Sequence, residues 1–116
     1  MALNRAVRLR KSSDFQRVRQ QGRAVSSRLL ILAWVPNQDS KLRIGFSISK
    51  RISKQAVERN YIKRLLSEAI RGLLSELSPG WDIVLSARPA ITTVDLPVLE
   101  QDVVSLLRRA RLLKPE

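Results

Sequence analysis

Residues 42–71, "LRIGFSISKRISKQAVERNYIKRLLSEAIR", join two strongly patterned segments through a short basic link. Apolar and polar residues alternate over residues 42–49, which predicts a strand with one buried face. From Ile62 onward apolar residues recur at close to a 3.6-residue period, which predicts a long amphipathic helix over residues 55–77. The rest of the predicted fold is arranged around this strand and this helix.

The start of that helix carries the wrong charge for a helix that stands alone in water. Six basic residues and one acid lie between positions 50 and 64. A helix N-terminus is partly positive, and Arg59 and Lys63 form a like-charge pair one turn apart, so each feature costs about 0.3–1 kcal/mol. A face that only solubilises a helix mixes both signs. We therefore interpret the stretch as a phosphate-binding surface, where free N–H groups and cations become favourable.

Two further helices are predicted at the two ends of the chain. The first covers residues 13–21, with Ser13 and Gln16 as a capping box and Gly22 as its end. The last begins after Asp95, which is predicted to cap it. Its predicted apolar face consists of Leu96, Leu99, Val103, Leu106 and Ala110.

Two other apolar runs, residues 28–35 and 81–87, predict strands. Residues 36–40, "PNQDS", form a turn cluster, so we expect the first of these strands to pair antiparallel with residues 42–49. The segment "SPG" at 78–80 is expected to end the long helix. The order helix, strands, helix, strand, helix predicts an α+β sandwich with helices covering one antiparallel or mixed sheet.

The composition excludes several chemistries. The chain has 116 residues, 44% of them apolar, which suits one domain spanning residues 1–116. It has no cysteine and no histidine, which excludes disulfides, thiol nucleophiles, histidine-based triads and zinc sites with Cys or His ligands. No apolar run reaches the roughly 18 residues of a membrane span, and residues 1–13 lack the apolar region of a secretory signal. We expect a cytoplasmic protein.

The charge is unevenly distributed along the chain. The net charge is +12, and residues 1–71 hold 17 of the 22 basic residues against four acids. A lopsided basic domain of this size most often binds a polyanion. A membrane surface is the rival partner, but only 4% of the residues are aromatic, and membrane-surface helices usually carry bulky aromatic side chains. Nucleic acid is the partner that the composition favours.

Residues 46–71, "FSISKRISKQAVERNYIKRLLSEAIR", resemble the motif region of the protein subunit of bacterial ribonuclease P. That family has a strand ending in Ser/Ala-Lys-Lys, a short basic loop, and a helix that opens with Ala-x-x-Arg-Asn-Arg-x-Lys-Arg. The matching positions are Ser49, Lys50, Arg51, Ala56, Arg59, Asn60, Lys63, Arg64 and Glu68. Residues 8–23, 42–49 and 82–90 are similar to the family's first helix, central strand and third long strand, so the resemblance spans nearly the whole chain in order.

The resemblance implies an α-β sandwich of order α-β-β(-β)-α-β-α, with a mixed sheet and a left-handed crossover between parallel strands. It implies a non-catalytic subunit that binds a catalytic RNA, in a holoenzyme that removes the 5′ leader from precursor tRNA. Mg²⁺ would be held mainly by the RNA, with no catalytic or metal-binding residue on the chain, no membrane and no obligate protein partner. The implied contacts to the catalytic RNA are Lys50, Arg51, Lys54, Arg59, Asn60, Lys63, Arg64 and Arg71. The implied cleft for the single-stranded leader, between the first helix and the sheet, holds Phe15, Arg8, Arg10, Arg19 and Arg88.

Three positions depart from the family pattern. Tyr61 stands where the family has its second Arg, Arg19 where many members have an aromatic, and Ser67 where a basic residue is frequent. Tyr61 either weakens one phosphate contact or replaces it with stacking on its ring. Arg19 leaves Phe15 as the aromatic available to stack on a leader base.

Other classes of protein stay open on composition alone. A small ribosomal protein, or another non-catalytic RNA-binding protein, is the main alternative. A nucleoid DNA-binding protein would more often carry a helix-turn-helix or a dimer-forming element, and neither pattern is present. A two-metal nuclease needs clustered carboxylates, and the ten acids of this chain are scattered along it. The ordered pattern of motifs favours the ribonuclease P family.

Overall fold

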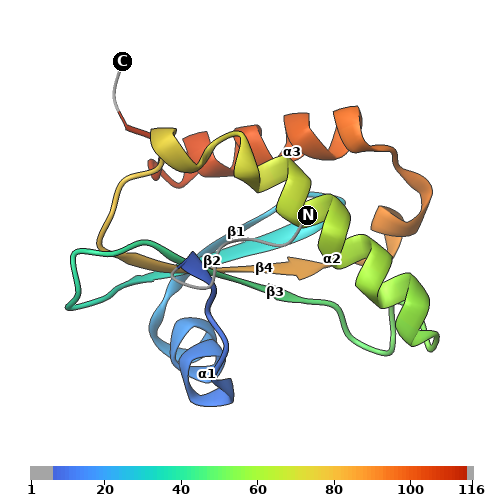
Figure 1. The fold of residues 1–116 in the computed structure, drawn as a ribbon, viewed down its shortest axis with the longest axis horizontal. Helices are drawn as coiled ribbons and strands as arrows, with labels where there is room; N and C mark the ends of the chain where they lie inside the picture. Colours follow the sequence, from blue (N-terminus) through green and yellow to red (C-terminus); the bar gives the residue numbers. More distant parts are fainter. Residues whose placement is uncertain (1–6, 115–116) are drawn as a thin grey trace.

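A four-stranded sheet runs through the middle of the molecule, with helices on both of its faces (Figure 1). The computed structural model describes residues 7–114. The strands are β1 (Arg23–Ser26), β2 (Leu30–Pro36), β3 (Arg43–Ser47) and β4 (Trp81–Ala87). The helices are α1 (Ser12–Gln21) on one face, α2 (Ala56–Arg71) and α3 (Leu96–Arg109) on the other, and the short 3-10 turns η2 (Leu74–Glu76) and η3 (Pro89–Thr93). The predicted α+β class and element order are confirmed.

The strand order β1-β2-β4-β3 corrects the predicted pairing of the second and third strands. β2 runs antiparallel to β4 and β3 runs parallel to it, so β2 and β3 lie apart. The reason is burial, because residues 82–85 of β4 are all buried and such a strand needs neighbours on both edges. Gly80, just before β4, bonds to the segments next to both neighbouring strands. Its N–H donates to the Lys41 carbonyl (2.9 Å) before β3, and its carbonyl accepts from the Asn37 N–H (2.9 Å) after β2. Helix α2 makes the crossover between the parallel strands β3 and β4, and its left hand stays a prediction.

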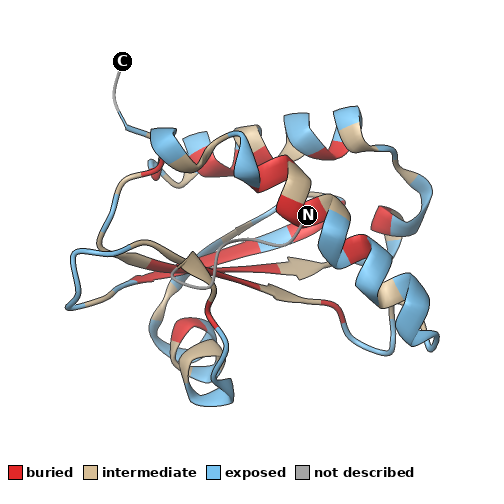
Figure 2. Cartoon of the chain, in the orientation of Figure 1, coloured by how far each residue is buried: buried red, intermediate tan, exposed pale blue. Residues whose placement is uncertain are grey.

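Two apolar cores of unequal size lie on the two faces of the sheet, and Figure 2 shows buried residues on the strands and on the inward sides of the helices. The larger core lies between the sheet and α2 with α3, and β3 and its flanks contribute Leu42, Ile44, Phe46 and Ile48, as the alternation predicts. The smaller core, beneath α1, consists of Leu9, Val18, Ala33, Val35 and Val84, with Phe15 packed against it. Because α1 packs mainly over β2 and β4, the edge of β3 on this face stays accessible.

Helix α1 differs from the prediction at its N-terminal end and agrees with it at its C-terminal end. The helix begins at Ser12 after Lys11 and has no side-chain cap, so the predicted capping box of Ser13 and Gln16 is wrong. Ser13 lies inside the first turn, where its side chain cannot cap the helix. Gly22 ends the helix as predicted, and a Cβ there would lie 2.4 Å from the Val18 carbonyl oxygen. This close approach lets the chain turn directly into β1, a short exposed edge strand that the sequence pattern did not predict.

The later helices show one correction and one confirmation. α2 ends at Arg71 rather than at residue 77, since Gly72 is a poor helix former and the chain continues into η2. The buried Leu77 instead forms an isolated bridge with Leu113. Asp95 caps α3 as predicted, because its Oδ1 accepts a hydrogen bond from the Val98 N–H (3.3 Å).

Candidate nucleic-acid interface

An open groove runs along β3, between α2 and the segment that precedes α1. The Leu9 N–H donates to the Ile44 carbonyl (2.9 Å), which holds this segment beside β3. The groove encloses about 560 Å³. Its lining residues are Arg8, Leu9, Arg10, Phe15, Ile44, Gly45, Phe46, Asn60, Lys63, Arg64 and Ser67. The groove therefore contains residues from both surfaces that the resemblance implies, the basic helix that contacts the catalytic RNA and the cleft that holds the leader.

The lining of the groove is positively charged. Arg8 and Arg10 come from one wall and Lys63 and Arg64 from the other, and none of the lining residues is acidic. The Nε atom of Arg8 is buried and has no hydrogen-bond partner within the described chain. A buried donor without a partner is costly, so the Arg8 side chain is not fully satisfied by the described chain. The exposed nitrogens of the basic side chains that line the groove can bind an anionic oxygen. The donor set fits phosphate.

Phe15 forms part of the floor of the groove. Its ring lies so close to β3 that a Cβ on Gly45 would be 2.4 Å from the ring Cζ atom. On the other side, the Arg19 guanidinium carbon lies 6.0 Å from the ring centroid, and its Nη2 donates to Ser47 Oγ (2.5 Å). Phe15 and Arg10 also line a second, smaller pocket with Arg19, so the aromatic floor extends past the groove along α1. The half-buried ring thus packs on the small core and still faces the groove.

Ser67 corrects the predicted arrangement of the basic helix. At 100° per residue, a helical wheel of the long helix sets Ser67 opposite the apolar stripe centred near Leu73, which predicts a solvent-facing side chain. The structure instead buries Ser67, with only 6% of its surface exposed. It lies on the flank of α2 that forms the groove wall, and its hydroxyl donates to the Lys63 carbonyl (2.9 Å).

Four other predicted RNA contacts lie at the start of α2. Lys50, Arg51 and Lys54 are exposed in the link between β3 and α2. Arg59 is half-buried, and its Nη1 donates to the Ser53 carbonyl (2.9 Å), so it holds this link against the helix.

The remaining two predicted residues lie outside the lining of both pockets. Arg71, the last residue of α2, lies 3.6 Å from the carboxylate of Glu68. Arg88 follows β4, and its Nη1 donates to the Ser27 carbonyl (2.9 Å). The structure therefore places seven of the thirteen predicted residues in the two pockets, four at the start of α2, and these two apart from both groups.

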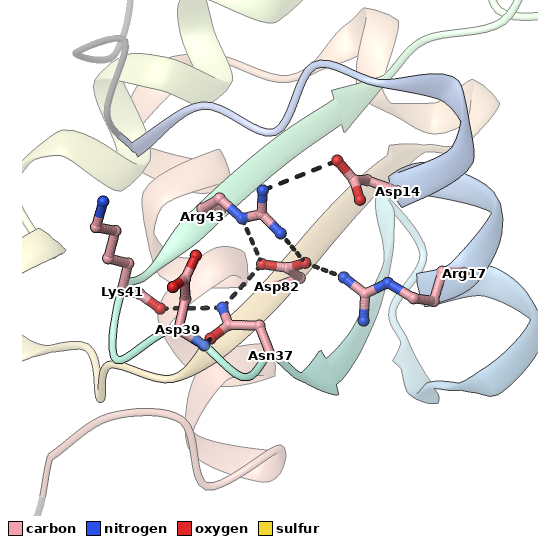
Figure 3. A network of polar contacts seen from close by, with 7 residues as sticks. All are labelled: Asp14, Arg17, Asn37, Asp39, Lys41, Arg43 and Asp82. Atoms are coloured by element: carbon pink, nitrogen blue, oxygen red, sulfur yellow. Dashed lines mark hydrogen bonds and ion pairs between the residues drawn. The ribbon is translucent and has the colours of Figure 1, made fainter.

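A second charged region, the Asp82 cluster, lies where α1 meets the starts of β3 and β4 (Figure 3). It consists of Asp82, Arg17, Arg43, Asn37 and Asp14. Asp82 is fully buried and accepts two hydrogen bonds from Arg43 (2.8 and 2.9 Å), one from Asn37 Nδ2 (2.9 Å) and one from Arg17. Asp14 lies 3.9 Å from a third nitrogen of Arg43. The cluster ties α1 to the sheet.

Charge is balanced inside this cluster. Burial raises the pKa of Asp82, but the hydrogen bonds from Arg43 and Asn37 and the charges of Arg43 and Arg17 outweigh it, so the pKa lies below its ordinary value. The hydrogen bond to Asp82 raises the pKa of the Arg43 guanidinium. Both groups are therefore held in their charged forms.

Comparisons with known proteins decide the family. The family model "Ribonuclease P" matches residues 3–111. The chain belongs to the bacterial ribonuclease P protein family. The ribonuclease P protein component of Chloroflexus aurantiacus is 42% identical over 112 residues, which cover 96% of this chain and 82% of that protein. That of Cyanothece sp. is 40% identical, covering 96% and 97%.

A solved structure agrees with this family. The RNase P protein of Staphylococcus aureus has a TM-score of 0.86 and 28% identity to this chain, covering 95% of this chain and all of that one. The chain is thus the protein subunit of ribonuclease P, a ribonuclease holoenzyme, and the alternative of a small ribosomal protein is set aside.

Neither a protein-held metal nor a membrane span is suggested by the described residues of this ribonuclease P protein. Over residues 7–114, no three His, Cys, Asp or Glu side chains come together to hold a metal ion. The groove lining offers no carboxylate, so it does not fit Mg²⁺ as a protein-held ion. No helix in this part of the chain is long and apolar enough to cross a membrane.

Sequence reasoning missed the Asp82 cluster of this ribonuclease P protein. The one signal in the sequence is an acid at the start of the otherwise apolar strand "WDIVLSA", and the neighbouring residues indicate only a local role for it. Its partners Arg17 and Arg43 are 65 and 39 positions away in the sequence. Nothing in the spacing of the residues indicates that they meet.

Proposed function

We propose that the chain binds the catalytic RNA of ribonuclease P through α2 and the basic link before it, and that the groove along β3 holds the 5′ leader of precursor tRNA. The observation that carries the proposal is the groove, where four basic side chains and an aromatic ring meet without an acid. Membership of the ribonuclease P family supplies the RNA partners.

The chemistry of the groove suits a single strand. Proteins that bind single-stranded nucleic acid combine a positive channel for the backbone with aromatic rings on which bases stack. Arg8 and Arg10 are placed to bind phosphates, and Phe15 offers its ring at the floor. Arg19, next to the ring, adds charge at the α1 end of this path. Together they can hold a strand without reading its sequence.

The start of α2 suits folded RNA instead. Its first N–H groups point outward and carry the positive end of the helix dipole, which favours a phosphate. Lys50, Arg51 and Lys54 surround that end, and all three are exposed. Asn60 and Arg64 lie one turn further along on the groove side. The electrostatic penalties noted in the sequence are reversed when this surface meets RNA.

Catalysis in this proposal belongs to the RNA. Mg²⁺ bound by that RNA would activate the water and stabilise the leaving oxygen. The residues of this chain bind and orient the leader and the RNA, and none is assigned a proton transfer.

Reconstitution tests the proposal. Purified protein is mixed with bacterial ribonuclease P RNA at a magnesium concentration too low for the RNA alone, and cleavage of precursor tRNA is followed. We expect cleavage at the leader junction only when both components are present. Cleavage by the protein alone that survives ribonuclease treatment, or no stimulation of the RNA, would contradict the proposal.

A further inference from the structure

The outer side of α2 carries two apolar side chains that nothing in the described chain covers. Val57 is 77% exposed and Tyr61 is 53% exposed. They lie four positions apart on one helix, so their side chains are neighbours on its surface. Isolated exposed apolar residues are common on proteins, but these two form a continuous platform, which we call the Val57–Tyr61 platform.

Folding does not account for this platform. Neither residue belongs to either apolar core. Valine is a weaker helix former than lysine or glutamate, because its branched Cβ restricts the side chain in a helix. At 3.6 residues per turn, Val57 lies on the opposite side of α2 from the buried Ile62 and Leu66, and Tyr61 lies on the flank next to it.

The surroundings of the platform indicate its ligand. Arg64 lies three positions after Tyr61 on the same side of the helix, and the exposed Lys54 lies just before the helix start. Glu58, three positions before Tyr61, is also exposed, so the ring has an acid on one side and the cation Arg64 on the other. An exposed aromatic ring beside a cation matches a nucleotide, whose base stacks on the ring while a phosphate meets Arg64. Bases that are free to stack in folded RNA are those of loops and bulges.

We propose that the Val57–Tyr61 platform stacks against an unpaired nucleobase of the RNA that α2 binds. The inference rests on the proposed function and adds a base contact to what would otherwise be a phosphate-binding surface. It differs from the contact assigned to Phe15, whose ring lies at the floor of a groove that a strand must enter. The platform projects outward and reaches a base that the folded RNA presents.

The test compares substitutions at Tyr61 in binding to ribonuclease P RNA. Tyr61→Ala is expected to weaken binding by about 5- to 150-fold, the range that corresponds to losing one base stack. The log–log salt slope should stay unchanged, because no charge is removed. Tyr61→Phe should bind as tightly as the unaltered chain, since its ring still stacks. Val98→Ala is the matched control, because Val98 is 44% exposed in the first turn of α3.

Three outcomes would overturn the inference. One is Tyr61→Ala binding as tightly as the unaltered chain while Arg64→Ala binds more weakly, which leaves the proposed function standing. Another is loss of binding in Tyr61→Phe as well, which assigns the effect to the hydroxyl. The third is loss of self-association, measured by sedimentation, with RNA affinity unchanged, which makes a second copy the occupant. If the unaltered chain does not bind the RNA, the proposed function itself fails.

Discussion

The Asp82 cluster and the groove along β3 both gather arginines from distant parts of the chain, but they differ in what the arginines meet. In the cluster, two guanidinium groups bind one buried carboxylate that also accepts from Asn37. In the groove, four basic side chains and no acid line the two walls, and the buried Nε of Arg8 has no partner among residues 7–114. The cluster is complete within the chain, whereas in the proposed function the groove is completed by phosphates of a bound RNA.

The contrast separates two uses of positive charge. A buried ion pair with satisfied hydrogen bonds fixes geometry, and removing one partner leaves an uncompensated charge. Unpaired cations do little for folding and a great deal for binding a polyanion. The cluster should therefore control stability, and the groove should control RNA affinity.

The largest expected effect is on folding. Asp82→Ala should lower the free energy of unfolding by about 3 kcal/mol, because Arg17 and Arg43 lose their common partner. That figure is at the low end of the range for buried pairs because both arginines remain partly exposed. Denaturant titration measures the loss. Asp39→Ala, at an exposed acid beside the same cluster, is the control and should change stability by less than about 0.5 kcal/mol. Equal losses in the two variants would remove the distinction between the regions.

The next effect concerns the aromatic floor of the groove. Phe15→Ala should weaken binding of precursor tRNA to the holoenzyme by about 1–3 kcal/mol and leave mature tRNA unaffected. Gly45→Ala should cause the same selective loss with the ring still present, because the new methyl group would collide with it. The measurement is the ratio of the two affinities, together with thermal melting. A large drop in melting temperature with an unchanged ratio would make Phe15 a core residue only.

A smaller effect is expected from a single cation. Arg64→Ala should reduce the magnitude of the log–log salt slope of RNA binding by about one, because one phosphate contact is lost. Its melting temperature should stay unchanged. Arg108→Ala, which removes an exposed charge from the last turn of α3, should leave the slope as it is. The same slope change in both variants would mean that net charge matters and the position of the charge does not.

The smallest effect at neutral pH is the titration of the cluster itself. Because folding lowers the pKa of Asp82, the folded chain holds this proton less tightly than the unfolded chain. Its stabilisation is complete above the unfolded pKa of about 3.9 and is lost as the pH falls through the lower folded value. Unfolding free energy measured against pH should show this acid loss in the unaltered chain and less of it in Asp82→Ala. Identical profiles would contradict the role of the cluster.

Local patterns predicted the elements well. The strand at 81–87, the alternation of β3 and the cap at Asp95 all follow from neighbouring residues. The pairing of β2 with β3 could not be judged in the same way, because it depends on a strand that appears some forty positions later and takes the place between them. The helical wheel misplaced Ser67 for a similar reason, since it records distance from the apolar stripe and not which segment lies alongside.

The candidate site was predictable in composition more than in arrangement. The motif residues Asn60, Lys63 and Arg64 were named from the sequence, and so were Arg8, Arg10 and Phe15. That these two groups share one groove depends on the backbone hydrogen bond between Leu9 and Ile44, which no spacing rule indicates. The exposure of Tyr61 likewise became known only with the fold.

The position of β4 has a consequence for how the chain reaches this fold. The interior strand β4 is the last strand to be synthesised, so β2 and β3 emerge from the ribosome without the neighbour that separates them. A hairpin between them would be the easiest early structure, and it has to open before β4 can enter. Contacts between distant segments slow folding. We therefore expect the sheet to form late, after translation has passed residue 87, with α2 already in place to carry β4 back to β3.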